Sequence, residues 1–301
     1  MAYLLQQLLN GLHMGALYAL LAFGYALSHG VIRRTNLAHG AVFAFAGQIA
    51  ILAAVWGWRV LWLTLPATLS LGIAMGFAYA ALAGLILARF VFAPLASRSP
   101  NTIVAATLGA ALVLGELGRI AADTQDFWLP PLLATPVTFW TSGHFDVTLT
   151  VIQLLDMAIV AAALAAGWLC LTRARFGARW RAVCEDPLAA AMCGVDTQRV
   201  FTLAIIASAL TAALAGVLAA LHFGNISFGT GLVFGLKILF IAAVGGYHAP
   251  LLSAAGAGLV GMAEALWTGY FPADWRDAAI FMALIALLVL SPGRGAEAER
   301  V

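Results

Sequence analysis

Residues 150–196 read TVIQLLDMAIVAAALAAGWLCLTRARFGARWRAVCEDPLAAAMCGVD, an apolar run followed directly by a charged segment. The apolar part, 150–171, has one acidic side chain and no basic one. About 20 such residues in a helix span the roughly 30 Å hydrocarbon core of a bilayer. We therefore expect 150–171 to cross a membrane and the charged segment 175–196 to lie at one membrane face.

The rest of the chain repeats this apolar pattern. Hydrophobic residues make up 63% of the 301, charged residues 9%, and the mean hydropathy is +0.99. These values lie outside the range of soluble domains. The sequence predicts an all-α polytopic membrane protein with one domain, 1–301, and about nine transmembrane helices. The range is eight to ten, because a re-entrant VIRRTNLAHG (31–40) changes the count. The predicted spans are 3–27, 37–56, 61–88, 101–121, 150–171, 200–221, 232–246, 250–268 and 278–291.

The basic residues orient these spans, because cytoplasmic loops carry an excess of Lys and Arg. Eleven of the fifteen fall on one side of the nine-span arrangement, so we expect the N-terminus outside, the C-terminus inside and segment 172–199 in the cytoplasm. The N-terminal residues lack a basic region, so we expect no cleavable leader. The eleven are Arg33, Arg34, Arg89, Arg98, Arg173, Arg175, Arg179, Arg181, Arg199, Arg294 and Arg300, against Arg59, Arg119, Lys237 and Arg276.

Several function classes lack their sequence signals. The near-neutral net charge argues against nucleic acid, and three cysteines give no disulfide framework. Leu236 precedes the single lysine, Lys237, so the chain has no P-loop and binds no ATP in that way. No G-x-S-x-G or H-E-x-x-H motif and no dense His/Cys/Asp cluster is present, so we predict no enzyme, no bound cofactor and no metal site.

The longest external connection is predicted at 122–149. It has no Lys or Arg, and Trp128 and Trp140 suit a membrane–water boundary. Its prolines exclude one continuous span. Two interpretations remain open: a loop with interfacial aromatics, or a docking surface for a partner that delivers a solute.

The charged segment contains the signals of a short capped helix. Asp186 is a good N-cap, Pro187 suits the first helical position, and Gly194 can end the helix in the left-handed conformation. Such a helix is too short to be stable alone in water, so we expect it to pack on something. The arginines before it can contact anionic headgroups. The segment is either a connector that fixes topology or a docking surface for another protein.

The pattern R-x-G-x-R-x-R-A-V-x-E-D-x-x-A-A-x-x-x-G-V-D in 175–196 resembles the cytoplasmic coupling segment of branched-chain amino acid ABC transporter permeases, the LivH-type family. The likeness covers nearly the whole chain. It includes LLNGLHMGALYALLAFGYALSHGVIRRTNLAHGAVFAFAG (8–47), ALAGVLAAL (213–221), GLKILFIAAVGGYHAPLLSAAGAGLVGMAEAL (235–266) and LSPGRG (290–295). Two departures are Ala178 before Arg179, and Tyr247 and His248 in a turn that is usually glycine-rich.

The resemblance implies a bacterial inner-membrane subunit of an ATP-driven importer for branched-chain or related amino acids. It also implies three partners: a periplasmic solute-binding protein, a second, LivM-like permease, and cytoplasmic ATPase subunits that use ATP. Membrane lipid surrounds the chain. On this resemblance the ATPase-coupling residues are Gly177, Arg179, Arg181, Glu185, Asp186, Pro187, Ala190 and Gly194.

Polar residues inside spans are costly and tend to face a bundle interior or a water-filled cavity. His39 is either a path residue or a hydrogen-bonded structural histidine, and Glu264 either lines the path or pairs with Lys237. Glu116 and Arg119 have the spacing of an i,i+3 ion pair. Glycine pairs 11/15, 72/76 and 231/235 favour helix packing. The predicted translocation-path residues are Asn10, Asn36, His39, Gly40, Asn225, Lys237 and Glu264.

Two segments resemble each other weakly. NLAHGAVFAFAG (36–47) and NISFGTGLVFGL (225–236) both have a Gly four residues after an Asn, on predicted opposite faces. This is the pattern of an inverted-topology repeat, whose interface holds the path in many transporters; chance similarity is the other interpretation. Together with Glu116, Asp156 and Glu264, the repeat favours an alternative function, an ion-gradient-driven transporter of a small polar solute.

Overall fold

The computed structural model describes residues 1–96, 98–143, 145–227, 229–245 and 249–290, and each predicted span overlaps one of its helices. Seven helices in this part of the chain are long and apolar enough to cross a membrane. The seven are α1 (Ala2–Ile32), α2 (Ala38–Arg59), α3 (Leu65–Ile86) with its continuation η1 (Leu87–Phe92) and α4 (Ala93–Leu95), α5 (Pro100–Ala121), α6 (Val151–Arg173), α9 (Thr197–Phe223) and α11 (Pro250–Tyr270). The other two predicted spans overlap the shorter helices α10 (Thr230–Gly245) and α12 (Arg276–Leu290), so the count of nine stays a prediction.

A β-hairpin corrects the all-α prediction. Strands β1 (Pro136–Ser142) and β2 (Phe145–Thr150) pair antiparallel, with Pro136 opposite Thr150 and a register shift between Thr138 and Trp140. These strands are rich in Val, Thr, Phe and Trp, the residues that favour strands, and in β2 they alternate about a buried face. The prediction considered only the prolines and tryptophans of 122–149 and missed this pattern.

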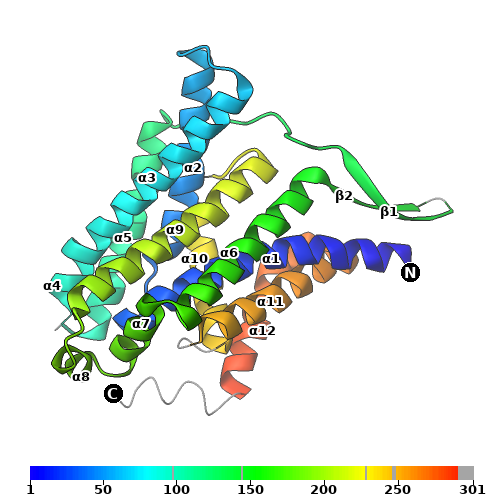
Figure 1. Cartoon of the computed structure of the whole chain (residues 1–301). Helices are drawn as coiled ribbons and strands as arrows, with labels where there is room; N and C mark the ends of the chain where they lie inside the picture. Colours follow the sequence, from blue (N-terminus) through cyan, green and yellow to red (C-terminus); the bar gives the residue numbers. More distant parts are fainter. Residues whose placement is uncertain (97, 144, 228, 246–248, 291–301) are drawn as a thin grey trace.

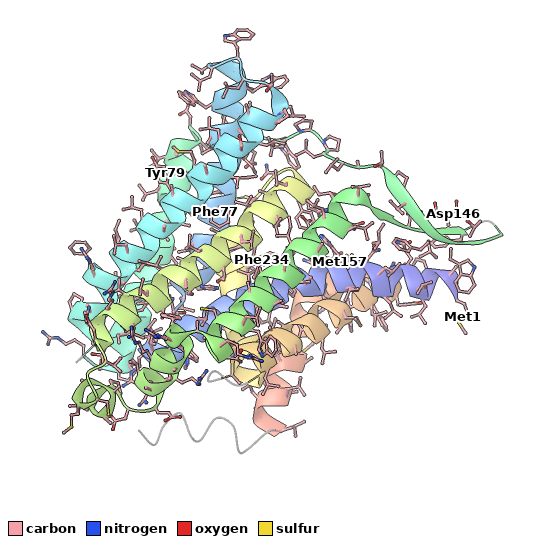
Figure 2. All side chains as sticks on the ribbon, viewed as in Figure 1. Met1, Phe77, Tyr79, Asp146, Met157 and Phe234 are labelled. Carbon is pink, nitrogen blue, oxygen red and sulfur yellow. The ribbon has the colours of Figure 1, made fainter. Side chains whose placement is uncertain are left out.

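The bundle has a buried centre and an exposed outer layer. In the most apolar window of each helix, 83% of α1, 72% of α2 and 67% of α9 is buried, against 17% of α6 and 28% of α5. The outer helices (Figure 1) therefore present apolar side chains to their surroundings (Figure 2), as expected of a protein solvated by lipid tails.

Small residues let the central helices approach closely. A Cβ added to Gly15 of α1 would lie 2.5 Å from the carbonyl oxygen of Gly258 of α11. A Cβ on Gly72 of α3 would lie 2.5 Å from the carbonyl oxygen of Ala50 of α2. Gly231 and Gly235 pack in the same way on the start of α2. The predicted packing role of these glycine pairs is confirmed.

The hairpin and the charged segment lie at opposite ends of α6 (Figure 1), which is about 35 Å long at 1.5 Å per residue. The hairpin shares its end of the molecule with the N-terminus, as the positions of Asp146 and Met1 show (Figure 2). The side-chain amide of Gln6 bonds both the backbone N–H and the carbonyl of Thr148, each at 2.8 Å. This contact fastens β2 to α1.

Candidate functional site

The charged segment folds into two short helices, α7 (Arg175–Glu185) and α8 (Pro187–Met192), and α8 has the predicted caps. Asp186 Oδ1 accepts hydrogen bonds from the backbone N–H of Leu188 at 2.8 Å and of Ala189 at 3.1 Å. Gly194 has φ of 81°, the left-handed conformation predicted for the helix end. Asp196 caps the next helix by accepting from the N–H of Arg199; the sequence analysis missed this cap, although an Asp before a helical segment is a readable signal.

Helix α7 is fixed to the end of α1 by two side chains that the sequence analysis did not assign to the site. The Trp180 indole is buried and donates to the carbonyl of Leu27 at 3.1 Å. Arg33 donates to the carbonyls of Cys184 and Glu185, both at 2.5 Å. These are carbonyls of the last turn of α7, which lack partners within the helix. The two contacts join α7 to α1.

The predicted coupling residues take different positions on this pair of helices. Gly177 is buried where α7 meets the carbonyl of Leu171, and Arg181 donates to that same carbonyl. The expected contact of the arginines with lipid headgroups stays a prediction. Ala190 is 4% exposed and packs on the bundle, which supplies the support that a short helix requires. The exposed coupling residues are Arg179, Arg181, Glu185, Asp186, Pro187 and Gly194.

The outer face of α8 is apolar. Leu188 is 77% exposed and Met192 is 87% exposed. They lie on the six-residue helix α8, which follows Glu185 and Asp186 and ends shortly before Gly194. Leu188 and Met192 are four residues apart, so both side chains lie on the same exposed face of α8.

A cavity of about 530 Å³ lies between α1, α2, the connection after α9 and α10. Its walls are mostly apolar and aromatic, and a few polar groups stand at the connection: Asn225, Ser227 and Thr230, with Asp126 from the connection before β1. Phe43 and Phe234 stack at 5.3 Å between ring centroids on its wall. The apolar lining residues include Met14, Leu17, Tyr18, Leu21, Phe43 and Phe234.

Lys237 and Glu264 are both buried and form an ion pair at 3.0 Å, so the pairing alternative is the one observed. Tyr18, a cavity residue, donates to Glu264 Oε2 at 2.9 Å. Asp277 Oδ1 lies 3.1 Å from Lys237 Nζ, and Arg276 Nε lies 3.2 Å from Glu264 Oε1. The network therefore reaches the cavity through Tyr18, and it includes three residues that the sequence analysis did not single out for the path.

Three other predicted path residues hold the start of α2 in place. Asn36 Oδ1 accepts from the N–H of Ala38 at 3.1 Å. His39 is buried, with Nε2 3.0 Å from the carbonyl of Leu21 and Nδ1 3.1 Å from Ser208 Oγ, which is the bonding of a structural histidine. Gly40 packs on the backbone of α10.

The seven predicted path residues do not form one site. Asn225 lines the cavity, and Lys237 and Glu264 meet it through Tyr18. Asn10 is half-buried and accepts a hydrogen bond from Gln6 near the hairpin end. Their roles in transport stay predictions.

The two similar segments are in contact and run in opposite directions. Gly40 packs on Gly235 and Gly231, while Gln48, eight residues further along α2, donates to the carbonyl of Ile226 at 3.2 Å. The internal symmetry itself stays a prediction. The turn with Tyr247 and His248, the tail LSPGRG beyond Leu290, and Arg294 and Arg300 lie outside the described residues.

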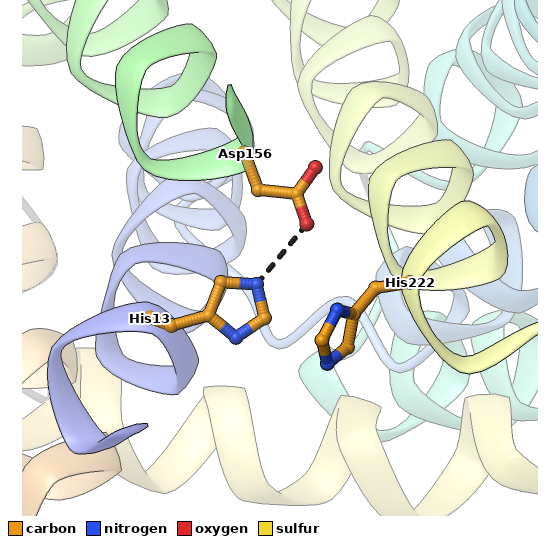
Figure 3. A group of neighbouring side chains, drawn as sticks. All are labelled: His13, Asp156 and His222. Carbon is orange, nitrogen blue, oxygen red and sulfur yellow. Dashed lines mark hydrogen bonds and ion pairs between the residues drawn. The ribbon is translucent and has the colours of Figure 1, made fainter. Parts of the chain in front are cut away.

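The structure also bears on two further sequence observations about polar side chains. The predicted ion pair of Glu116 and Arg119 is confirmed, with an N–O distance of 2.7 Å on the exposed side of α5. The sequence has no dense His/Cys/Asp cluster, but the fold brings together His13 of α1, Asp156 of α6 and His222 of α9 (Figure 3). Their separation along the chain hid the cluster.

The chain was compared with known proteins. The family described as branched-chain amino acid transport system / permease component matches residues 7–290. The protein named high-affinity branched-chain amino acid transport system permease protein LivH is 29% identical in Salmonella typhimurium and in Escherichia coli K12, over 96% of this chain and 94% of each relative. The permease protein BraD of Pseudomonas aeruginosa is 28% identical over the same shares. A solved structure, PsaBC from Streptococcus pneumoniae in complex with Fab, gives a TM-score of 0.45 at 14% identity over 94% of this chain and 89% of that chain, too distant to carry an inference.

The comparisons and the fold agree on the general class. The relatives are transport permease proteins of bacteria, which supports a transport role and not an enzymatic one. The seven apolar helices and these relatives place the protein in the bacterial inner membrane as a multi-pass protein. A match over residues 7–290 covers nearly all of the sequence. The chain therefore belongs to the family of permease components of branched-chain amino acid ABC transport systems.

Proposed function

We propose that this chain forms the translocation path of an ATP-driven importer and that separate ATPase subunits dock on α8. The observation that carries the proposal is the exposed apolar pair Leu188 and Met192 on a short helix that is capped at both ends. A connector that only fixed topology would need charge at this position, not an ordered apolar surface. The absence of a P-loop in the sequence agrees with ATP hydrolysis on another chain.

The contacts of α7 connect the proposed docking helix α8 to the cavity. A displacement of α8 passes to α7, and Trp180 and Arg33 join α7 to the end of α1. Helix α1 continues to Tyr18, which lines the cavity about 14 Å away from Leu27 along the helix. Movement of the docked ATPases would thus reposition one wall of the cavity and change its access.

The cavity supports an aliphatic amino acid as the solute. Its apolar wall suits a branched side chain, and its few polar groups at Asn225, Ser227 and Thr230 suit the amino and carboxylate ends. We propose a branched-chain or closely related amino acid, delivered by a periplasmic binding protein to the end of the bundle with the hairpin. The apolar outer helices would contact lipid and a second, LivM-like permease subunit.

The ion-coupled alternative keeps one candidate carboxylate. Glu116 pairs with Arg119 and Glu264 with Lys237, whereas Asp156 bonds His13 through one oxygen and its other oxygen has no partner among the described residues. The family match favours the ATP-driven importer instead.

Uptake in proteoliposomes tests the proposal. The chain is reconstituted with its second permease and its ATPase subunits, and with the binding protein on the opposite face; uptake of leucine, isoleucine and valine is compared with that of urea. We expect uptake that requires ATP hydrolysis and is lost in Leu188→Asp and Met192→Asp, while both variants still insert. The exposed Gln198→Glu of α9 is the matched control and is expected to retain uptake.

A different outcome would reject the proposal. ATP-dependent uptake that persists in both α8 variants would show that this helix does not couple the ATPase. Uptake by the chain alone, driven by a proton or sodium gradient, would establish the alternative.

A further inference from the structure

Three side chains from three helices meet, as Figure 3 shows. Asp156 lies near the start of α6, the end of that helix that follows the hairpin. His13 Nε2 lies 3.1 Å from Asp156 Oδ2, and the ring of His222 lies 4.4 Å from that of His13, centroid to centroid. His13 and Asp156 are each 1% exposed and His222 is half-buried. One ligand atom from each residue lies within 4.8 Å of the other two.

Two polar atoms of the cluster lack hydrogen-bond partners in the described part of the chain. Among the described residues, Asp156 Oδ1 and His222 Nδ1 are buried side-chain atoms with no hydrogen-bond partner. A buried carboxylate is costly unless it is paired and its oxygens are satisfied. The single bond to His13 occupies only one of the two oxygens of Asp156. A cation at this point would compensate the charge of the buried carboxylate.

The donor set selects the class of ion. Two imidazoles and one carboxylate suit Zn²⁺ and its neighbours among the divalent transition cations, whereas Mg²⁺ and Ca²⁺ prefer oxygen ligands alone. Zn²⁺ binds these groups at about 2.0–2.2 Å, so ligand atoms in a tetrahedral site lie roughly 3.3 Å apart. The His13–Asp156 spacing of 3.1 Å is already close to this value. The ligand atoms of the three residues lie within 4.8 Å of one another, so the His222 side chain has to approach the other two by up to about 1.5 Å to complete the site.

We infer that His13, Asp156 and His222 bind one divalent transition cation, with Zn²⁺ as the representative ion. The three protein ligands leave a fourth position for water. Helix α6 is the least buried of the seven candidate spans, and the ion fastens it to α1 and α9. The ion would hold the first turns of α6, which follow the hairpin. The other end of α6 leads directly into α7 and α8, the proposed coupling surface. The inference does not depend on the identity of the transported solute.

Metal binding by the purified full chain tests this site. The protein is prepared in detergent through a histidine-free affinity tag, stripped with a chelator, and titrated with Zn²⁺ against a competing indicator and with Co²⁺ by visible absorption. We expect one tightly bound equivalent of Zn²⁺, ligand-field bands of nitrogen- and oxygen-bound Co²⁺, and a higher thermal midpoint with metal. Asp156→Asn and His222→Gln are expected to lose all three signals.

Asp146→Asn, which removes an exposed carboxylate on β2, is the matched control and is expected to bind as the unmodified protein does. His222→Gln lies at the end of α9 and is half-buried, so it decides the result even where Asp156→Asn fails to fold. Absence of a stoichiometric Zn²⁺ equivalent in the unmodified chain would overturn the inference. So would equal binding in a folded His222→Gln variant, which would indicate an adventitious ion only.

Discussion

At the scale of single residues, contacts between residues close together in the sequence could be predicted, and contacts between distant residues could not. The caps of α8 and the Glu116–Arg119 pair involve neighbours three residues apart or fewer, and the sequence predicted them. Arg33 bonds Cys184, 151 residues away. Such contacts depend on how each helix is rotated in the bundle, and a helix that is apolar on all faces gives no signal for its rotation.

The buried pair of Lys237 and Glu264 gives the first prediction. Lys237→Met leaves Glu264 buried with one cation fewer, so we expect a loss of about 3–5 kcal/mol in the free energy of unfolding. Fluorescence-detected size-exclusion chromatography after heating measures the accompanying fall in the apparent thermal midpoint. The double variant Lys237→Met/Glu264→Gln should recover part of the loss, because it removes both charges.

Arg119→Ala is the control for this pair, since its partner Glu116 is exposed and the thermal midpoint should hardly change. Equal destabilisation by Lys237→Met and Arg119→Ala would contradict the assignment of a buried network.

Thiol reactivity gives the second prediction. Burial raises the pKa of the Cys184 thiol to about 12, so at pH 8 this group stays protonated and lacks the reactive thiolate. Cys193 is exposed at the end of α8. Mass spectrometry after brief maleimide treatment in detergent should find Cys193 modified well before Cys184; the reverse order would show that α7 is not packed on α1 as described.

At the scale of elements, the sequence predicted the helices well and the hairpin not at all. Long apolar runs have a single stable solution in a bilayer, because a helix satisfies its own backbone groups. The segment 136–150 is subject to no such constraint, and its alternating pattern was overlooked beside its prolines and tryptophans. The glycine pairs predicted close packing correctly but did not identify which helices meet.

The crossing of α1 and α11 gives the third prediction. Gly15→Val places atoms where a Cβ alone would lie 2.5 Å from a carbonyl oxygen of the partner helix, so the helices must separate. We expect a clear fall in the thermal midpoint and in the yield of monodisperse protein.

Gly109→Ala in α5 is the matched control, because a Cβ there meets nothing within 4 Å. It should be neutral or stabilising by up to about 1 kcal/mol, the difference in helix propensity. A tolerated Gly15→Val would show that α1 and α11 do not cross at this point.

At the scale of the whole molecule, the sequence and its family resemblance predicted the class of protein, and the fold added the arrangement. The family match confirmed the resemblance over residues 7–290. The predicted path residues coincide only in part with the cavity described above, and their roles in transport stay predictions. Polarity alone selected His39 and Asn36, which hold helices together, and passed over Tyr18, Phe43 and Phe234 on the cavity wall. An apolar cavity has no polar signature, so its walls become visible only when the helices are assembled.

The central claim is that α8 faces the cytoplasm and receives the ATPase subunits, and labelling of its native Cys193 tests it most directly. In a Cys170→Ser background, a membrane-impermeant maleimide is applied to inside-out and right-side-out vesicles, with and without co-produced ATPase subunits. We predict labelling of Cys193 only in inside-out vesicles and strong protection when the ATPase subunits are bound. Labelling from the outer face, or no protection by bound ATPase subunits, would contradict the account.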